Sequence, residues 1–311
     1  MKSNNLTDVA GVLLAGLLTG ACAAVGQAAP LTSATVTETK NEVLYKPAGG
    51  GERSAKVNDV VQGADVLRTG ERSLAEIEFS DKTITRLGSK SVFTFSTGTR
   101  EFHPGKGTTL IYVPKGSGGG RIVTTAITAA IEGTTVIVEE TERPPAPGQT
   151  TPRLLCKMVF LEGTGNVTLT HQRAACPISN RRIAPGQMIA QFADEPCLAP
   201  IEDIDLDLLV KRSPMVKGFS KPLPSLALID AQVAVQNSAK AGGTLVSPNP
   251  AAGVYSPNPM TGAQGISDSP MNTPSFAQGS LIPVGNGFFY STRPLPGSVP
   301  IAGGGGYLWR P

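Results

Sequence analysis

The chain has 311 residues, of which 16% are charged, and its formal net charge at neutral pH is +3. Soluble globular proteins average about 25% charged residues, and here 36 glycines and 26 prolines fill the difference. The composition excludes a strongly basic nucleic-acid-binding protein and indicates a chain with many turns.

Residues 1–28 have the pattern of a secretory signal peptide. Lys2 lies in a polar start, an apolar run covers residues 9–18, and small residues follow to Ala29. The run is shorter than the about 20 residues that a transmembrane helix needs. The sequence therefore predicts export to the periplasm, the cell surface or the medium, with no transmembrane helix in the mature chain. A lipid anchor at Cys22 is the alternative.

Short strands separated by polar turns are predicted from residue 32 onward. Ala75, Ile77 and Phe79 alternate with their neighbours at a period of two, which predicts a half-buried strand over residues 74–79. A tight turn is expected at residues 80–82, because Asp81 can bond to its own backbone. Further strands are expected at residues 32–45, 83–87, 92–95, 109–113, 121–126, 134–139, 154–161, 166–170 and 187–192.

Four connections between these strands are predicted from their polar, Gly and Pro content. Residues 98–107 are expected to form a polar loop, and residues 116–120 a flexible connection. Residues 162–165 carry a hairpin signal. An inserted, exposed Pro-rich loop is expected near residues 143–150, since proline cannot donate to a sheet ladder.

The stretch 63–95 resembles the FecR domain, a module of bacterial envelope proteins, and the resemblance extends over residues 33–195. Later parts of it are Leu161-Glu162-Gly163 and Gly186-Gln187. The family usually has glycine after the turn aspartate, where this chain has Lys82. The residues that carry the signature are Gly63, Asp65, Arg68, Thr69, Gly70, Ser73, Phe79, Asp81, Leu87, Gly88, Gly133 and Thr134.

The charged members of this signature are interpreted as structural. Asp65 and Asp81 are expected to fix turns, and Arg68 to pair with a neighbouring carboxylate or to cap strand-end carbonyls. Ligand contacts are the alternative. The two histidines, His103 and His171, lie in no nucleophile motif, and no metal-ligand spacing is present, so neither an enzyme nor a cofactor is predicted.

Three cysteines follow the predicted signal peptide. Cys176 and Cys197 flank polar loops, and an oxidising compartment favours a disulfide between them. Cys156 lies in an apolar segment and is expected to be buried as a thiol.

Two amphipathic helices are predicted at residues 200–236. Ile201, Ile204 and Leu208 recur at helical spacing until Pro214 ends the first helix. The second is expected at residues 226–236 with Ser225 as N-cap. Both are expected to pack on the β domain, with recruitment of a partner as the alternative.

Residues 237–311 are rich in Pro, Gly, Ser and Asn, which predicts a disordered tail. Aromatic residues near its end are candidates for docking to a partner. The alternative is that they are scattered surface residues. They are Phe288, Phe289, Tyr290 and Trp309.

The expected fold is therefore mainly β, a sandwich or rolled sheet followed by two helices and the tail. The resemblance implies a binding or signalling module. Its best-known relatives relay the state of a siderophore transporter to a cytoplasmic sigma factor through a membrane helix. That role is not expected here, because the FecR-like block follows the export signal almost directly.

The expected function is non-enzymatic binding of an envelope protein, or of a glycan or peptide ligand, and the resemblance implies envelope signalling as one setting for it. The alternative is a structural component of the cell surface, in which the Pro-rich tail acts as a spacer. An unrecognised hydrolase has no catalytic constellation to support it.

Overall fold

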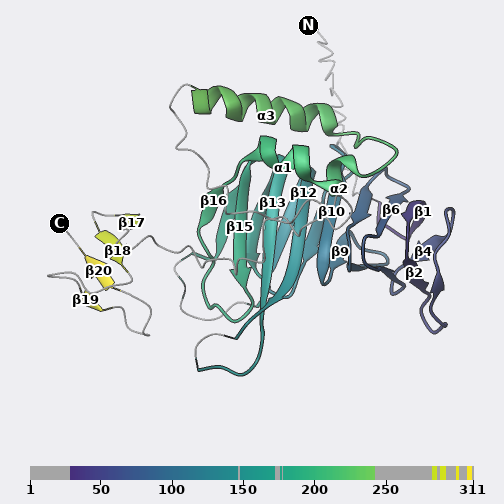
Figure 1. Ribbon diagram of the computed structural model, residues 1–311, viewed down its shortest axis with the longest axis horizontal. Helices are drawn as coiled ribbons and strands as arrows, with labels where there is room; N and C mark the ends of the chain where they lie inside the picture. The colour runs from purple at the N-terminus through teal and green to yellow at the C-terminus, as the bar shows by residue number, and fades with distance from the viewer. Residues whose placement is uncertain are drawn as a thin grey trace, which may run out of the picture.

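The computed structural model describes residues 29–145, 148–171, 176 and 178–241, and the backbone of short strands between residues 282 and 309. The predicted signal peptide and Cys22 lie outside the described residues. Within them, sixteen strands form one curled sheet with helices on one of its faces (Figure 1). The prediction of a mainly β fold is confirmed.

The strands of the large sheet are β1 Ser33–Lys40, β2 Val43–Lys46, β3 Arg53–Ser54, β4 Val60–Gln62, β5 Val66–Thr69, β6 Leu74–Phe79, β7 Ile84–Leu87, β8 Val92–Ser96, β9 Glu101–Pro104, β10 Gly107–Val113, β11 Gly120–Val123, β12 Ile127–Arg143, β13 Arg153–Leu169, β14 Asn180–Ile183, β15 Gln187–Phe192 and β16 Ile201–Asp203. The helices are α1 Leu206–Arg212, α2 Pro214–Lys217 and α3 Leu226–Ala241. Hydrogen-bonded neighbours follow the order β3-β2-β5-β8-β9-β11-β12-β10-β7-β6-β1-β4, and β13 joins β12 to β14 and β15.

The main core lies between the two halves of the curled sheet. The Phe79 ring on β6 meets the Phe95 ring on β8 at 5.0 Å and the Phe102 ring on β9 at 5.7 Å, both edge to face. β6 is not paired with β8 or β9, so these rings meet across the interior rather than along one ladder. Edge-to-face contact is a favoured arrangement for aromatic pairs.

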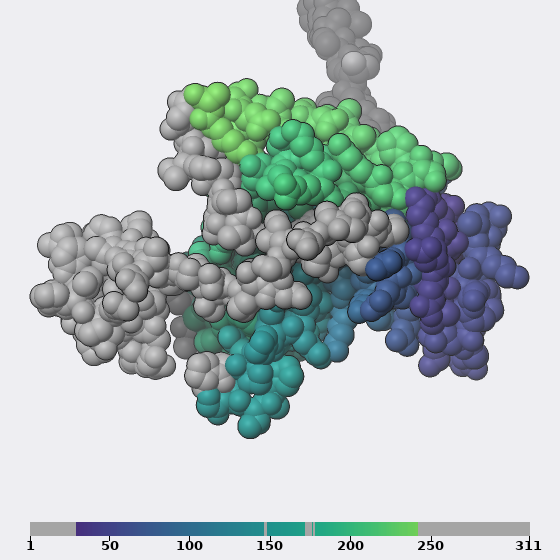
Figure 2. Space-filling view, viewed as in Figure 1, coloured from purple at the N-terminus to yellow at the C-terminus, as the bar shows by residue number. Residues whose placement is uncertain are grey.

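A second core lies between the sheet and the helices. Val159 of β13 and Met188 of β15 are buried in the same cluster as Leu206, Val216 and other helical side chains. The helices lie across one side of the strand layers (Figure 2). Alternate residues of β13 enter the two cores, with Cys156, Met158 and Phe160 in the first. A strand covered on both faces reads as a continuous apolar run.

The helical region differs from its prediction at both ends. The expected start at Ile201 is wrong, because Ile201–Asp203 pairs with β15 as β16. α1 begins after Asp205, whose side chain accepts a hydrogen bond from the Leu208 backbone nitrogen at 3.0 Å. α1 ends at Arg212, just before Pro214 as predicted, but Pro214 then begins α2, where a missing N–H costs no helical bond. The described residues therefore hold three helices rather than two.

α3 packs on the sheet through Ile229, with Leu226 and Val233 beside it. This is the stripe that the sequence placed against the β domain. The helix runs five residues beyond the predicted end at Gln236, to Ala241. None of the described helices has the length and apolarity that crossing a membrane would require.

The hairpin predicted at residues 162–165 is wrong, because β13 runs through it while paired with β12. The ladder register shifts beside Gly133 and Gly163, which have φ of +56° and +74°. A Cβ on Gly163 would lie 2.3 Å from the Gly133 carbonyl oxygen. The glycine that resembled a hairpin turn therefore forms a β-bulge inside a long strand pair.

The polar loop predicted at residues 98–107 is wrong in its middle, where β9 pairs with β8 and β11. β14 was not predicted. Residues 242–281 of the expected disordered tail lie outside the described residues. In the part beyond, the described backbone forms four short strands that pair in a separate sheet, β17 Ile282–Gly285, β18 Phe288–Ser291, β19 Val299–Pro300 and β20 Tyr307–Trp309.

Candidate functional site

The Asp65 carboxylate joins three parts of the chain. Its oxygens accept hydrogen bonds from the Tyr45 hydroxyl at 2.7 Å, the Gln62 backbone nitrogen at 2.8 Å and the Ala48 backbone nitrogen at 2.8 Å. Burial raises the pKa of Asp65, but these hydrogen bonds outweigh burial and hold it below its usual value. Asp65 is thus fully engaged in fixing the corner between β2, β4 and β5.

Asp81 shapes the turn between β6 and β7. Its side chain accepts hydrogen bonds from the Thr83 backbone nitrogen at 3.0 Å and the Thr83 hydroxyl at 2.9 Å. The Arg100 guanidinium donates to the same carboxylate. Lys82 follows with φ of +68°, a conformation in which glycine has no steric cost.

The small signature residues connect turns to one another. Thr69 donates its hydroxyl proton to the Gly88 carbonyl and accepts from the Ser91 backbone nitrogen at 2.9 Å. Ser73 accepts from the Glu42 backbone nitrogen at 3.1 Å.

Gly63 leaves no room for a side chain, because a Cβ there would lie 2.5 Å from the Thr97 backbone nitrogen. A Cβ on Gly70 would lie 2.1 Å from the Glu42 carboxylate and would displace that side chain. Other signature residues lie in the interior. Phe79 and Leu87 are in the main core, and the buried Thr134 donates to the Thr164 carbonyl at 3.1 Å beside the Gly133 bulge.

β6 is buried on both faces, so the prediction of a half-buried strand is wrong. Glu76 lies on the face that a half-buried strand would expose to solvent, yet Glu76 is only 4% exposed. Its carboxylate lies 2.7 Å from the Nε atom of Arg86, directly opposite on β7. Burial lowers the pKa of Arg86, and Glu76 acts in the opposite direction.

The Arg86 guanidinium also holds the chain around α2. It donates to the carbonyl oxygens of Met215 at 3.0 Å, Val216 at 3.2 Å and Lys221 at 2.6 Å. Its carbon lies 4.3 Å from the centre of the Phe219 ring, a cation–π contact. The sequence analysis did not single out Arg86, although the turn at Asp81 sets the register that places it opposite Glu76.

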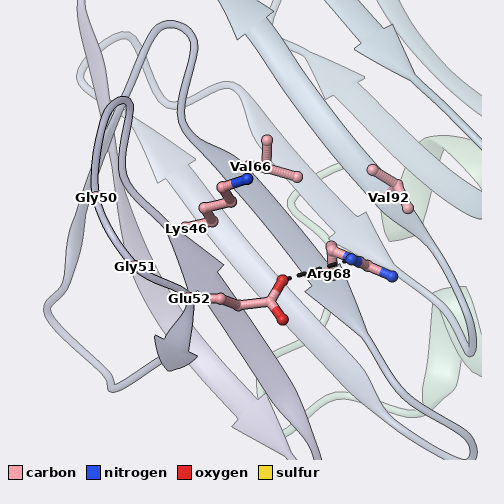
Figure 3. A pocket seen from close by; sticks show the side chains of 7 residues that line it. All are labelled: Lys46, Gly50, Gly51, Glu52, Val66, Arg68 and Val92. Carbon is pink, nitrogen blue, oxygen red and sulfur yellow. Dashed lines mark hydrogen bonds and ion pairs between the residues drawn. The ribbon is translucent and has the colours of Figure 1, made fainter.

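A pocket of about 670 Å³ lies on the face of β2, β5 and β8 that points away from the main core (Figure 3). In the ladders Lys46 lies opposite Val66, and Arg68 lies opposite Val92. Directly paired residues and residues two apart share a face of a sheet. Its lining residues are Lys46, Gly50, Gly51, Glu52, Val66, Arg68 and Val92.

Arg68 is the charged signature residue that remains accessible. Its Nη1 atom lies 3.5 Å from the Glu52 carboxylate, and the two side chains are 54% and 35% exposed. An exposed pair at this distance contributes little to stability. The sequence did not indicate the other lining residues, because β2, β5 and β8 come together only through sheet pairing.

Residues 65–146 match the FecR protein family. The match confirms the resemblance over this segment, which carries Asp65, Arg68, Asp81 and Arg86. It is shorter than the 33–195 expected from the sequence. No curated protein matches the chain.

Two crystal structures of a candidate anti-sigma factor from Parabacteroides distasonis are similar to the chain at 13% identity, each with a TM-score of 0.34. The alignments cover 48% of this chain and 65% and 64% of those chains, which is under two thirds of their length. A TM-score of this size does not establish a shared fold.

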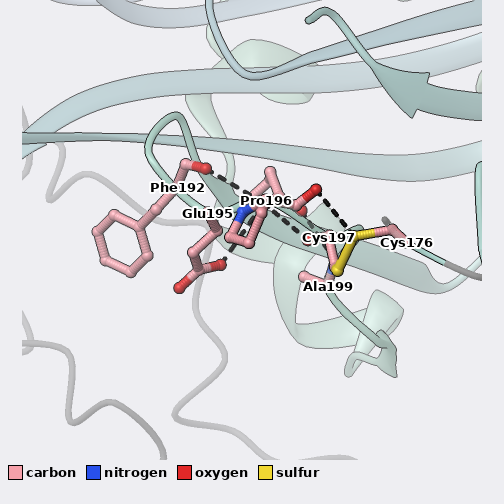
Figure 4. The surroundings of a disulfide bond; sticks show 7 residues. Cys176, Phe192, Glu195, Pro196, Cys197 and Ala199 are labelled. Carbon is pink, nitrogen blue, oxygen red and sulfur yellow. Dashed lines mark hydrogen bonds between the residues drawn. A yellow bond between two sulfur atoms is a disulfide. The ribbon is translucent and has the colours of Figure 1, made fainter. Parts of the chain in front are cut away.

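Cys176 and Cys197 lie outside the FecR segment and form a disulfide with a Cα–Cα distance of 5.5 Å. This is the pairing that the sequence predicted. The bond lies beside the turn that carries Glu195 and Pro196 (Figure 4). Cys156 is a buried free thiol, and burial raises its pKa, so it is a poor nucleophile.

The two histidines lie on or next to strands of the large sheet. His103 lies on β9 with its Nε2 atom 2.9 Å from the Ser96 hydroxyl, and His171 is exposed just after the end of β13. Phe288, Phe289 and Tyr290 lie in β18, and Trp309 in β20. Docking by these four aromatic residues stays a prediction.

Proposed function

We propose that the chain is an exported, non-enzymatic binding module of envelope signalling, which holds a partner at the pocket around Arg68. The family match supports an envelope role. The choice of site rests on a contrast among the charged residues of the signature. The Asp65 and Asp81 carboxylates accept hydrogen bonds that fix turns, whereas Arg68 lies exposed in a pocket.

The proposed activity is saturable association without turnover. The polar groups of the pocket are one ammonium, one guanidinium and one carboxylate. A nucleophile held by a base is the usual requirement for covalent catalysis, and none of the lining residues supplies such a pair. Such a pocket is suited to hold a charged group of a partner.

Site-specific photo-crosslinking tests this proposal. A photoreactive amino acid is placed at Gly51 in the full chain, where a Cβ would meet no atom within 4 Å, and the protein is exposed to light in the envelope fraction of its own cell. Lys211 is the control position, since it lies exposed on α1 in the helical layer. We expect one discrete adduct from position 51 that Arg68→Gln abolishes.

Equal adducts from both positions, or none from position 51, would contradict a binding site at this pocket. Adducts between copies of the chain would favour the structural role instead.

A further inference from the structure

The pocket around Arg68 carries a charge imbalance that no part of the described structure neutralises. Lys46 has no ion-pair partner among the described residues. Arg68 has one long contact with Glu52, at 3.5 Å. Two cations therefore share one carboxylate, and the guanidinium keeps most of its donors for another acceptor.

The rest of the lining is apolar or lacks side chains. Val66 and Val92 are partly buried; in the ladders Val66 lies beside Lys46 and Val92 lies beside Arg68. Gly50 and Gly51 form the rim, and a Cβ on Gly51 would meet no atom within 4 Å. A group that fits this pocket has one negative charge beside a small apolar surface.

The chemistry of the lining discriminates among anions. Guanidinium groups bind carboxylates in a planar, two-pronged geometry. The side chains of the lining carry a net charge of +1, which a single carboxylate neutralises and a doubly charged phosphate would exceed. The lining holds no aromatic ring and no side-chain amide or hydroxyl, so it has no neutral polar groups to match sugar hydroxyls.

We propose that this pocket binds a carboxylate of a peptide segment, with an aliphatic side chain of that segment resting on Val66 and Val92. The carboxylate comes from the C-terminus of the segment or from an internal acidic side chain. Glu52 competes for Arg68 and so limits the affinity. The inference rests on the proposed function and names the ligand chemistry of that site.

The test is an NMR titration of the full chain with three short probes. These are acetyl-Val-Ala-Val with a free C-terminus, the same peptide with an amidated C-terminus, and acetyl-Val-Glu-Val amide. We expect saturable shifts of the Gly50, Gly51 and Val66 backbone signals with at least one carboxylate probe and none with the uncharged amide. The free acid and the glutamate probe distinguish the two sources of the carboxylate.

Two variants with opposite expected signs sharpen the test. Arg68→Gln should weaken binding at least tenfold, because it removes the guanidinium. Glu52→Gln should strengthen binding several-fold, because it removes the competing carboxylate while keeping the shape. Both effects should shrink as the salt concentration rises.

Equal binding of the uncharged amide, or weaker binding by Glu52→Gln, would overturn the inference. So would tighter binding of a uronic-acid trisaccharide or inorganic phosphate at the same signals. If position 51 still forms its adduct in that case, the site stands and only the ligand class is wrong. If both experiments fail, the proposed function fails as well.

Discussion

Lys82 occupies a backbone conformation that L-residues avoid, with φ of +68° in the turn after Asp81. Its ammonium lies 2.7 Å from the Glu78 carboxylate, in an exposed pair. Left-handed conformations are strained for non-glycine residues. We expect Lys82→Gly to raise the melting temperature by about 2–4 °C, a typical response to a small stabilisation in a domain of this size.

The matched control is Lys82→Ala, which loses the ion pair but keeps the strain. Thermal unfolding followed by circular dichroism compares the three proteins. A melting temperature for Lys82→Gly at or below that of Lys82→Ala would mean that backbone strain does not limit this turn.

The hydrogen bond between Tyr45 and Asp65 predicts how stability depends on pH at both ends of the scale. Burial and the Asp65 carboxylate raise the pKa of Tyr45 from 10.0 to about 12. A raised pKa gives stability that is present below the unfolded value and is lost as pH rises from about 10 to about 12. The lowered pKa of Asp65 gives stability that is lost as pH falls below its unfolded value, about 3.9.

Melting temperatures across pH for the wild type and Tyr45→Phe test this. The wild type should lose more stability than the variant between pH 10 and 12, since the variant has no phenol to ionise at this position. Parallel curves in that range would contradict the coupling. Tyr112, whose pKa is also raised, is common to both proteins and cancels in the comparison.

At the scale of elements, the β-bulge between β12 and β13 predicts unequal costs for two glycine substitutions. Gly163 and Gly98 have similar φ values, +74° and +79°. A Cβ at Gly163 would lie 2.3 Å from a backbone oxygen, whereas one at Gly98 would meet nothing within 4 Å. Gly98→Ala should cost about 1 kcal/mol, mainly from backbone strain, and Gly163→Ala clearly more.

Chemical denaturation of both variants measures the difference. Equal free energies of unfolding would mean that the strands separate freely at the bulge.

The same element shows the limit of local sequence patterns. The residues around Gly163 carry the composition of a hairpin, and only pairing with a second 17-residue strand makes them a bulge.

Strands could be predicted from sequence where β-branched and aromatic residues are bounded by a proline, as at β10, or where apolar residues alternate, as at β15. The buried ion pair of Glu76 and Arg86 could not, because both side chains read as solvent-facing until the chain around α2 covers them. The pocket could not be predicted either, because its residues are separate in sequence and only sheet pairing brings them together.

At the scale of the whole molecule, truncation after Ala241 is expected to leave the body folded. The buried residues of both described cores end at Ile229, so the truncation removes none of the described core side chains. Its circular dichroism spectrum should keep its β shape, and its melting temperature should change by no more than about 2 °C. A cooperative loss of structure would show that the tail belongs to the fold.

Trp309, the sole tryptophan, reports on the tail in the full chain. We expect emission typical of a solvent-exposed indole that acrylamide quenches readily. A blue-shifted, protected emission in the free protein would contradict the prediction that the aromatic residues of the tail are free to dock to a partner.

The contacts of Arg86 determine how much of the chain must emerge before the molecule can finish folding. Its backbone acceptors lie 129, 130 and 135 residues later in the chain, well beyond the end of the FecR segment at residue 146. A chain emerging from its N-terminus therefore carries a guanidinium without these acceptors until about 70 more residues than the family segment have appeared. Contacts this distant in sequence slow folding. The chain then remains incompletely folded through most of its emergence, the state in which a polypeptide can still be threaded through a narrow channel.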